Sequence, residues 1–282
     1  AAVNHDVRNT VFSYIPNTAE SAFYGLIEGV DKWLNNRKRQ SILKKGDAIT
    51  VADFERIMDV RPRIEKIAVK DIKLRTFITE DRSRDDLVAH VYDVTYGIIR
   101  RGKDSLVVID DSIVRGTTLK ESIIRILDRL DPAKIVIVSS SPQIRYPDCY
   151  GIDMSRLGDF IAFRAALELL KLTGREQLIT DVYGRAKEEL KKPDAEMVNL
   201  VQEIYAPFTD QEISNQIAVM LKTSEIKADL EIVFQSVEGL HKACPGHTGD
   251  WYFTGNYPTP GGNRVVNRAF VNYIEGRGGR AY

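Results

Sequence analysis

The pattern that most constrains the fold is a buried strand, an amphipathic helix and a second buried strand in close succession. The apolar run Leu106–Ile109 ends at two acidic residues, Asp110 and Asp111. Leucine and isoleucine then recur at helical spacing over residues 119–130, and a second apolar run follows at Ile135–Val138. Apolar runs of this kind are typical of strands that helices cover on both faces. The short links predict a right-handed βαβ crossover in a parallel sheet.

The start of the chain repeats this alternation. Val11–Ile15 is a short run rich in β-forming residues, and Asn17 and Glu20 have the spacing of a helix-capping box. Apolar residues at helical spacing over 23–34 predict a helix that ends before a highly charged, weakly periodic stretch, residues 35–70. That stretch is predicted to be an excursion or insertion, and its pattern does not define a role.

Beyond about residue 158 the periodicity becomes helical. Helical segments are expected at 160–172, 195–206 and 210–240, the last of them open to a break. The sequence therefore predicts an α/β domain over residues 1–158 and a helical extension with a Gly- and Pro-rich C-terminal segment over 159–282.

Composition excludes several classes of protein. Forty Lys and Arg balance 40 Asp and Glu, so no global field attracts the chain to nucleic acid or to an anionic membrane. The apolar runs are far shorter than a bilayer span, and the amino terminus lacks a basic-then-apolar leader, which argues against membrane insertion and secretion. The two cysteines, Cys149 and Cys244, exclude a disulfide framework and fit a reducing cytoplasm.

The candidate site is the loop between the buried strand and the amphipathic helix. Gly116 permits close backbone approach, and the hydroxyls of Thr117 and Thr118 with the free N–H groups of the helix start can surround a phosphate. Asp110 and Asp111 would repel free phosphate, so the ligand must also offer hydroxyls or a bound Mg²⁺. A sugar phosphate meets both requirements. The plainer alternative, in which the acids only end a strand and cap a turn, does not explain the adjacent phosphate-compatible loop.

A second phosphate motif has the wrong context. Gly97–Lys103 matches the first part of a P-loop. A P-loop lysine is followed by Ser or Thr and opens a helix, whereas Lys103 is followed by Asp104 and a predicted strand. We interpret this segment as a basic turn.

The loop also carries a family resemblance. Asp110–Thr118 resembles the phosphoribosyl pyrophosphate (PRPP) loop of type I phosphoribosyltransferases, and more narrowly that of the glutamine PRPP amidotransferases. Three other segments agree in order: Ile15–Ala19 with the family's Pro-(Asp/Glu)-(Ser/Thr) loop, Arg75–Ile78 with Arg-Thr-Phe-Ile, and 141–154 with its closing segment. The resemblance implies a type I phosphoribosyltransferase-like sheet in residues 1–158, and it weakens beyond residue 162.

The resemblance implies a reaction, in which an amine displaces pyrophosphate from the anomeric carbon of PRPP to give phosphoribosylamine, the first step of purine synthesis. Asp110 and Asp111 would hold the ribose hydroxyls and stabilise the positive charge that develops on the ring. With Thr18 they would also form the shell of Mg²⁺. The 5′-phosphate would be held by a set of loop residues: Ser112, Arg115, Gly116, Thr117 and Thr118.

By resemblance, a hood closes over PRPP and excludes water. It would contribute Arg75 to catalysis and Arg82 and Arg84 to substrate binding, although solvated surface arginines explain these residues equally well. The family's Val-Arg-x-Lys-Leu is replaced by Ala89–Asp93, which loses a basic pair, and Asn17 stands where a carboxylate is usual.

The resemblance also bears on nitrogen source, cofactors and partners. The family's glutaminase nucleophile is a terminal Cys, and this chain has no Cys before Cys149, so ammonia, a missing segment or another chain is expected to supply nitrogen. Gly249 and Tyr252 occupy the Cys-x-x-Cys positions of cluster-bearing members, so no iron–sulfur cluster is expected. The spacing of His241, Cys244 and His247 matches no standard zinc site. Purine nucleotide inhibitors, a homo-oligomer and a cytoplasmic location are implied, with no nucleic acid or membrane partner.

Two other functions remain open at this point. A domain of this fold can keep its phosphate-binding loop after losing hood residues, which would make the chain a non-catalytic sensor of PRPP or nucleotides. The third possibility is a transferase acting on a preformed base.

Overall fold

The computed structural model describes residues 2–16, 18–70, 92–149, 154–247 and 249–278. The chain divides into two compact units that interleave along the sequence. Unit 1 comprises Ala1–Asp111, Thr118–Ser140 and Thr223–Glu231, and unit 2 comprises Ser112–Thr117, Ser141–Lys222 and Ile232–Tyr282. The division predicted at residue 158 stays a prediction.

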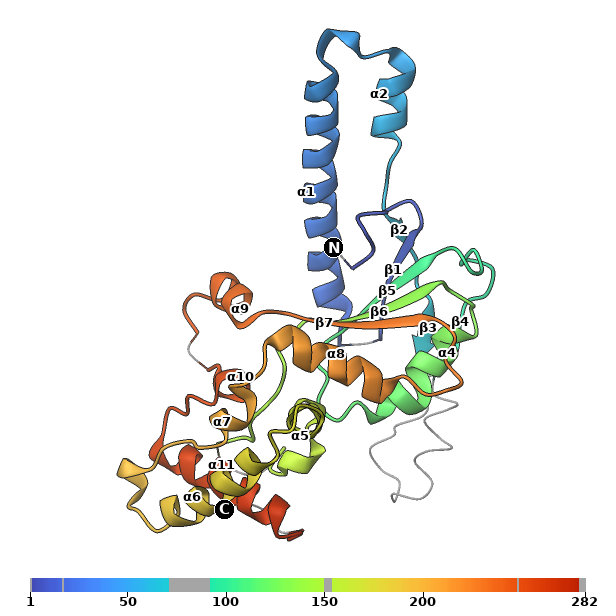
Figure 1. The fold of residues 1–282 in the computed structure, drawn as a ribbon. Coiled ribbons are helices and arrows are strands. Elements are labelled where there is room, and N and C mark those ends of the chain that lie inside the picture. The colour runs from blue at the N-terminus through green and yellow to red at the C-terminus, as the bar shows by residue number, and fades with distance from the viewer. Residues whose placement is uncertain (1, 17, 71–91, 150–153, 248, 279–282) are drawn as a thin grey trace. The chain divides into compact units, whose positions relative to one another are not determined.

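The main sheet has five strands in the order β2-β1-β5-β6-β7 (Figure 1). Their bounds are Thr10–Tyr14 for β1, Arg63–Ile64 for β2, Ser105–Asp110 for β5, Lys134–Ser139 for β6 and Asp229–Phe234 for β7. β1 pairs in parallel with β2 and β5, and β5 pairs in parallel with β6. The strands predicted from the three apolar runs are therefore confirmed, as is their parallel pairing.

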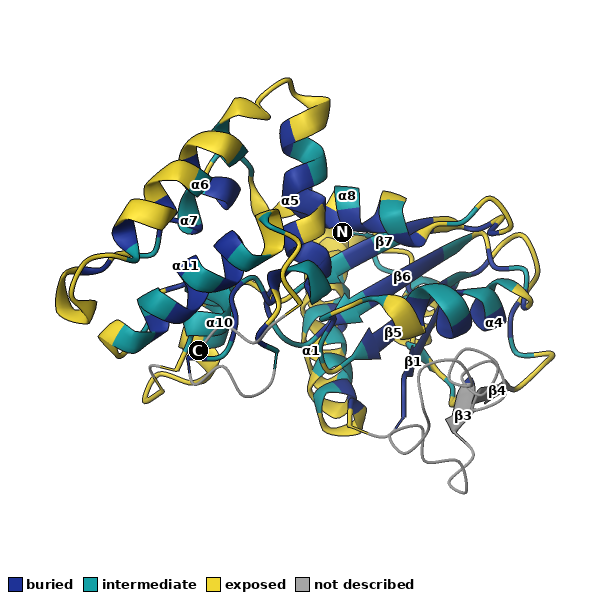
Figure 2. Ribbon diagram, turned by 90° about the horizontal axis from the view of Figure 1, so that it is seen from below, coloured by how far each residue is buried: buried dark blue, intermediate teal, exposed yellow. Residues whose placement is uncertain are grey.

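Residues between β5 and β6 form the expected helix. It consists of a π-helical turn, Leu119–Ile123, followed by α4, Ile124–Asp128. The residues that carried the helical spacing are buried, including Leu119, Ile123 and Leu127. Figure 2 shows α4, drawn largely in dark blue and teal, beside the dark, buried strand β6. The amphipathic pattern therefore predicted both the helix and the face that it buries.

The first helix differs from its prediction at both ends. α1 spans Glu20–Lys45, so the charged run beyond Leu34 continues the helix rather than ending it. Lys, Arg and Gln are good helix formers, and α1 ends only at Gly46, whose N–H donates to the carbonyl of Ile42. The capping box is wrong as well, because the N-cap is Ala19, with no side-chain cap, and the Glu20 carboxylate accepts from the Tyr14 hydroxyl at 3.0 Å. Asn17 lies outside the described residues.

The stretch predicted as an insertion contains a helical hairpin. After a 3₁₀ turn, Gly46–Ala48, the chain forms α2, Val51–Met58, which lies beside α1 (Figure 1). The Thr50 hydroxyl caps α2 by accepting from the N–H of Asp53 at 3.1 Å. Beyond β2, strand β3, Ala68–Lys70, pairs antiparallel with β4, Tyr92–Val94.

Unit 2 is mainly helical, as predicted. Its helices are α5 (Ile161–Leu172), α6 (Gln177–Glu189), α7 (Gln202–Tyr205), α8 (Asp210–Leu221), α9 (Val237–Ala243), α10 (Trp251–Thr254) and α11 (Pro260–Ile274). Phe163 of α5 is fully buried and meets Phe270 of α11 edge-to-face, with ring centroids 6.1 Å apart. This aromatic contact joins α5 to the last helix of the unit.

Two of the predicted helical segments are wrong in part. Residues 195–206 are helical only in a 3₁₀ turn, Asp194–Glu196, and in the four-residue α7. The segment 210–240 contains β7 between α8 and α9, because Leu230 and Ile232 are buried and alternate with more exposed neighbours. Within the described residues, no helix combines the length and apolar composition that crossing a bilayer requires.

A buried carboxylate joins β2 to the turn before β5. Asp104 has no exposed side-chain surface and accepts from Arg63 Nη1 at 2.6 Å and from Arg100 Nε at 3.0 Å. The turn that resembled a P-loop thus has a structural role. Burial opposes ionisation of Asp104, but hydrogen bonds from Arg100 and Arg63 outweigh it and hold the pKa of that carboxyl below its ordinary value.

We expect Asp104→Asn to lower the free energy of unfolding by about 3 kcal/mol at pH 7, because it leaves two guanidinium groups without their buried partner. A lowered pKa in the folded state gives stability above the unfolded pKa that is lost as pH falls, so the difference from wild type should shrink below about pH 4. Urea unfolding of both proteins at several pH values measures this difference in the free energy of unfolding. Asp31→Asn, at an exposed position of α1, is the control. A difference that does not depend on pH would contradict the ionic account.

Candidate functional site

The acidic pair lies where β5 ends, in unit 1. Asp110 is the last residue of β5, and its carbonyl accepts from the N–H of Ser140 at 2.9 Å. The Ser140 hydroxyl donates to the carbonyl of Asp111 at 2.9 Å. The end of β5 is therefore tied to the residue that follows β6, which fixes the backbone of both acids.

The carboxyl of Asp110 is unlike that of an ordinary surface acid. Burial, followed by the negative charge of Asp111, raises the pKa of Asp110 to about 7, although the N–H of Asp111 donates to its Oδ1 at 2.9 Å and opposes the shift. With this pKa the carboxyl is only partly ionised near neutral pH. A nearby positive charge would favour its ionised form.

Thr18 follows β1 at the same edge of the sheet. The N–H of Ile15 donates to the carbonyl of Ile109 at 2.9 Å, so the chain leaving β1 starts beside the end of β5. Thr18 comes three residues later and is exposed. Parallel pairing thus places the segment with Thr18 at the strand end that carries the acids.

The loop after the acids is held in unit 2 by the start of α5. The N–H of Ile161 donates to the carbonyl of Val114 at 2.8 Å, and Arg164 Nη2 donates to the carbonyl of Arg115 at 2.7 Å. The Arg115 side chain is 56% exposed and donates to Asp159 Oδ2 at 3.1 Å. Two of these hydrogen bonds therefore hold the backbone of the loop, and the third orients the Arg115 side chain.

Gly116 is required for two reasons. Its φ of +73° lies in the left-handed region, and an added Cβ would lie 2.6 Å from Ile161 Cδ1 and 3.0 Å from Leu221 Cδ2. The sequence predicts that Gly116 lets the backbone approach a ligand closely. The structure shows, in addition, that Gly116 packs closely against Ile161 and Leu221 within unit 2. Thr117 and Thr118 are exposed and begin the helix, whereas Ser112 is half-buried.

The predicted site residues are divided between the two units, and some of them lie outside the described residues. Asp110, Asp111 and Thr118 belong to unit 1, while Ser112–Thr117 belong to unit 2, although the nine residues are consecutive. Arg75, Arg82 and Arg84 lie outside the described residues, as do residues 89–91 of the altered hood.

Sequence reasoning missed three residues that hold the site. Ser140 had a usable signal, because residues that follow neighbouring parallel strands meet at one edge. Asp159 and Arg164 had none, since they contact a loop more than 40 positions earlier.

The residues considered for other metals do not gather into a site. His241 Nε2 lies 2.9 Å from Asp250 Oδ2, and Cys244 is exposed. Across the described part of the chain, no three His, Cys, Asp or Glu side chains form a group that could hold a metal ion.

Known proteins share part of this sequence. The amidophosphoribosyltransferase of Pasteurella multocida is 43% identical over 76 residues, which is 27% of this chain and 15% of that protein. The enzyme of Escherichia coli is 40% identical over 76 residues, and that of Saccharomyces cerevisiae is 41% identical over 80, each again 15% of the relative. The chain resembles amidophosphoribosyltransferases. The matched segment spans about 15% of the length of these curated relatives, and no family model matches the chain.

Two solved structures align with 89% of the chain at 22% sequence identity. One is described as the allosteric regulatory enzyme of purine biosynthesis, with a TM-score of 0.47 and 37% of that chain covered. The other is a glutamine PRPP amidotransferase from B. subtilis complexed with ADP and GMP, with a TM-score of 0.46 and 38% covered.

We expect Gly116→Ala to lower the free energy of unfolding by about 2 kcal/mol, because it combines a left-handed backbone with a clash against Ile161. Denaturant unfolding measures the loss. Gly25→Ala is the matched control, since a Cβ there meets nothing within 4 Å and alanine favours a helix. Equal stability changes in the two variants would show that Gly116 is not constrained as described.

We expect Asp110→Asn to be more stable than the wild type at pH 8, by on the order of 1–3 kcal/mol. An acid whose pKa is raised in the folded state binds more protons there than in the unfolded chain, so wild-type stability falls as pH rises from about 4 to 7. Asparagine carries no such charge, and the gain should shrink at pH 5. Unfolding curves at both pH values test this, and a gain that is the same at both refutes the raised pKa.

Proposed function

We propose that the chain transfers the phosphoribosyl group of PRPP to ammonia, giving 5-phosphoribosylamine and pyrophosphate. One observation carries this proposal. A buried strand ends in two carboxylates, one with a pKa raised to about 7, and continues directly into a glycine loop and a helix start. The similarity to amidophosphoribosyltransferases supports the choice of an amine as acceptor.

The carboxylates suit the charge that this reaction develops. As pyrophosphate departs, positive charge builds on the ribose ring, and the amine nitrogen forms its bond to the anomeric carbon and then loses a proton to solvent. Asp110 and Asp111 would accept hydrogen bonds from the ribose hydroxyls and stabilise that positive charge. Their backbone is fixed by Ser140, so little reorganisation is needed.

The loop suits the other end of the substrate. Backbone N–H groups at the start of a helix bind phosphate oxygens, and the hydroxyls of Thr117 and Thr118 add donors. Arg115 is already held by Asp159 through one nitrogen, and its guanidinium retains further donors for a phosphate. Ser112 would complete this phosphate site. By resemblance, Arg75 would contribute to catalysis and Arg82 and Arg84 to substrate binding.

The same residues suit a magnesium ion. The carboxylates of Asp110 and Asp111 and the hydroxyl of Thr18 are the hard oxygen donors that Mg²⁺ prefers, and the raised pKa of Asp110 marks a carboxyl that a cation would help to ionise. When bound with PRPP, the ion would neutralise charge on the departing pyrophosphate.

Several finer features of the proposal come from the resemblance alone. They are a glutaminase as the ammonia source, inhibition by purine nucleotides, a homo-oligomeric assembly and a cytoplasmic location.

The assay supplies PRPP, Mg²⁺ and ammonium at pH 8 and measures pyrophosphate release, so no glutaminase is required. We expect Asp110→Asn to reduce the rate by about 100-fold or more, the loss typical of removing one preorganised charge-stabilising group. Its unfolding curve shows whether it remains folded. Asp31→Asn, at an exposed position of α1, should retain the wild-type rate.

The other outcomes separate the alternatives. Saturable binding of PRPP without turnover would identify a sensor. Turnover with a purine or pyrimidine but not with ammonia would identify a base transferase. Neither binding nor turnover would refute a PRPP site altogether.

A further inference from the structure

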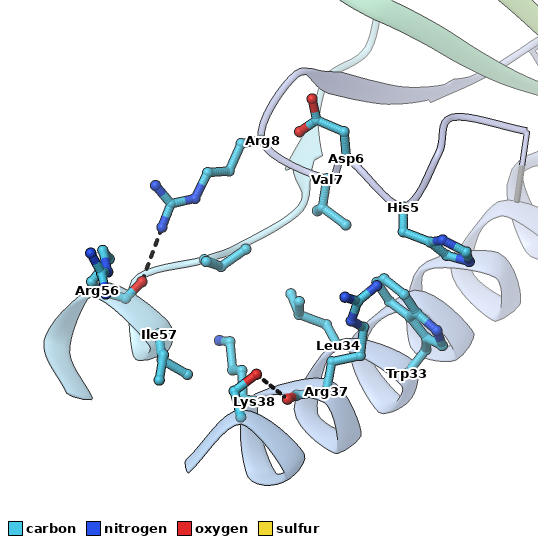
Figure 3. A pocket seen from close by; sticks show the side chains of 12 residues that line it. His5, Asp6, Val7, Arg8, Trp33, Leu34, Arg37, Lys38, Arg56 and Ile57 are labelled. Atoms are coloured by element: carbon cyan, nitrogen blue, oxygen red, sulfur yellow. Dashed lines mark hydrogen bonds between the residues drawn. The ribbon is translucent and has the colours of Figure 1, made fainter. Parts of the chain in front are cut away.

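Unit 1 contains a cavity that is lined partly by residues 35–70, the stretch whose sequence defined no role. It measures about 360 Å³ and lies between the N-terminal loop, the middle of α1 and the carboxyl end of α2. Figure 3 shows Trp33 and Arg37 on one side and Arg8 reaching across to α2 on the other. Pockets of a few hundred Å³ are large enough for small ligands.

Positive charge dominates the lining. Four cations, Arg8, Arg37, Lys38 and Arg56, accompany a single carboxylate, Asp6. Asp6 accepts hydrogen bonds from the backbone and side chain of Asn9. The lining thus holds more cations than carboxylates. Its one carboxylate already accepts hydrogen bonds from Asn9, which is not a lining residue.

Three of these cations are not neutralised by a carboxylate. Arg56 pairs with Asp53 at 2.6 Å, but Arg8, Arg37 and Lys38 form no ion pair with any described residue. Like charges gathered around one concavity repel each other, and an anion bound among them would relieve that repulsion. The cluster thus has the electrostatics of an anion site.

Part of the cluster also has a structural role. Arg8 Nη2 donates to the carbonyl of Arg56 at 3.0 Å, and Lys38 Nζ donates to the carbonyl of Met58 at 2.9 Å, so both satisfy the carboxyl end of α2. Each uses one donor in this way, whereas a guanidinium has five and an ammonium three. Capping of α2 therefore leaves donors for a ligand.

Arg37 has no such structural role. Its side chain forms no hydrogen bond with the described residues and lies over the Trp33 ring, 5.1 Å from the ring centroid. This contact orients the guanidinium and leaves its N–H donors unused. Apolar side chains, among them Leu34 and Ile57, line the same cavity beside these cations.

We propose that this cavity binds a small multivalent oxyanion, a polyphosphate or a polycarboxylate, through Arg37, Lys38 and Arg8. Arginine and lysine bind both kinds of group, and the planar guanidinium can do so through two parallel hydrogen bonds. The proposal does not depend on phosphoribosyl transfer.

The tryptophans provide a local probe. The chain has two, Trp33 in the cavity wall and Trp251 in unit 2. Trp33 stacks on His5 with ring centroids 5.4 Å apart and contacts Arg37. In a Trp251→Phe background, an anion that engages Arg37 should change the Trp33 emission.

The experiment titrates tripolyphosphate into Trp251→Phe protein without Mg²⁺, at constant ionic strength, and follows Trp33 emission. We expect a saturable change, and Arg37→Gln and Lys38→Gln should each weaken binding roughly tenfold, the loss typical of one hydrogen bond to a charged group. Lys32→Gln is the matched control, because Lys32 lies on α1, is 73% exposed and pairs with Glu28 outside the cavity. Calorimetry on the same substitutions in an otherwise unchanged chain gives a second readout if Trp251→Phe does not fold.

Citrate separates the two kinds of anion. Saturable binding of both anions supports a general oxyanion site, and binding of only one narrows it to phosphates or to carboxylates. A response that does not saturate, or an equal loss in Arg37→Gln and Lys32→Gln, would overturn the proposal.

Discussion

Parallel pairing of β1, β5 and β6 is the constraint on which the candidate site depends. The register places Tyr14 opposite Ile109 and Asp110 opposite Ser139, so these strands end together at one edge of the sheet. Thr18, the acidic pair and Ser140 therefore follow neighbouring strands at the same edge. A shift in register would separate the acids from the serine that holds their backbone. The main-chain hydrogen bonds of the sheet thus determine where the side chains of the proposed site lie.

The parts of this arrangement that sequence could predict are those with a local signal. A strand buried on both faces is a continuous apolar run, so β5 and β6 were evident, as was the helix between them. The acids at the end of β5 followed directly from that run. Asp159, in contrast, holds Arg115 from 44 residues away, and no periodicity links the two. Contacts of this kind arise from tertiary packing and have no counterpart in the local sequence.

The wrong predictions have physical reasons too. The predicted end of α1 is wrong because a charged run does not by itself end a helix, and an exposed helix tolerates Lys, Arg and Gln well. The helical prediction misses β7 because its six residues lie between two helical segments, and their alternation of buried and exposed residues is too short to distinguish a strand. The longer α1 bears on the proposed anion site, since its added turns place Arg37 and Lys38 in the cavity wall. Part of the predicted insertion is thereby an extension of a helix that begins at the sheet.

The residues proposed to bind PRPP are held in conformations or charge states that an isolated chain would avoid. Gly116 adopts a left-handed backbone against Ile161, and Asp110 is half-buried beside a second acid. Such features persist where surrounding contacts fix them, and here hydrogen bonds from the start of α5 and from Ser140 do so. For Asp110 the consequence is chemical. Because its pKa is about 7, a bound cation or a developing positive charge would shift it toward the ionised form at neutral pH. The partial burial that destabilises this carboxylate in the folded chain is therefore what would make its charge responsive to the positive charge of the proposed reaction.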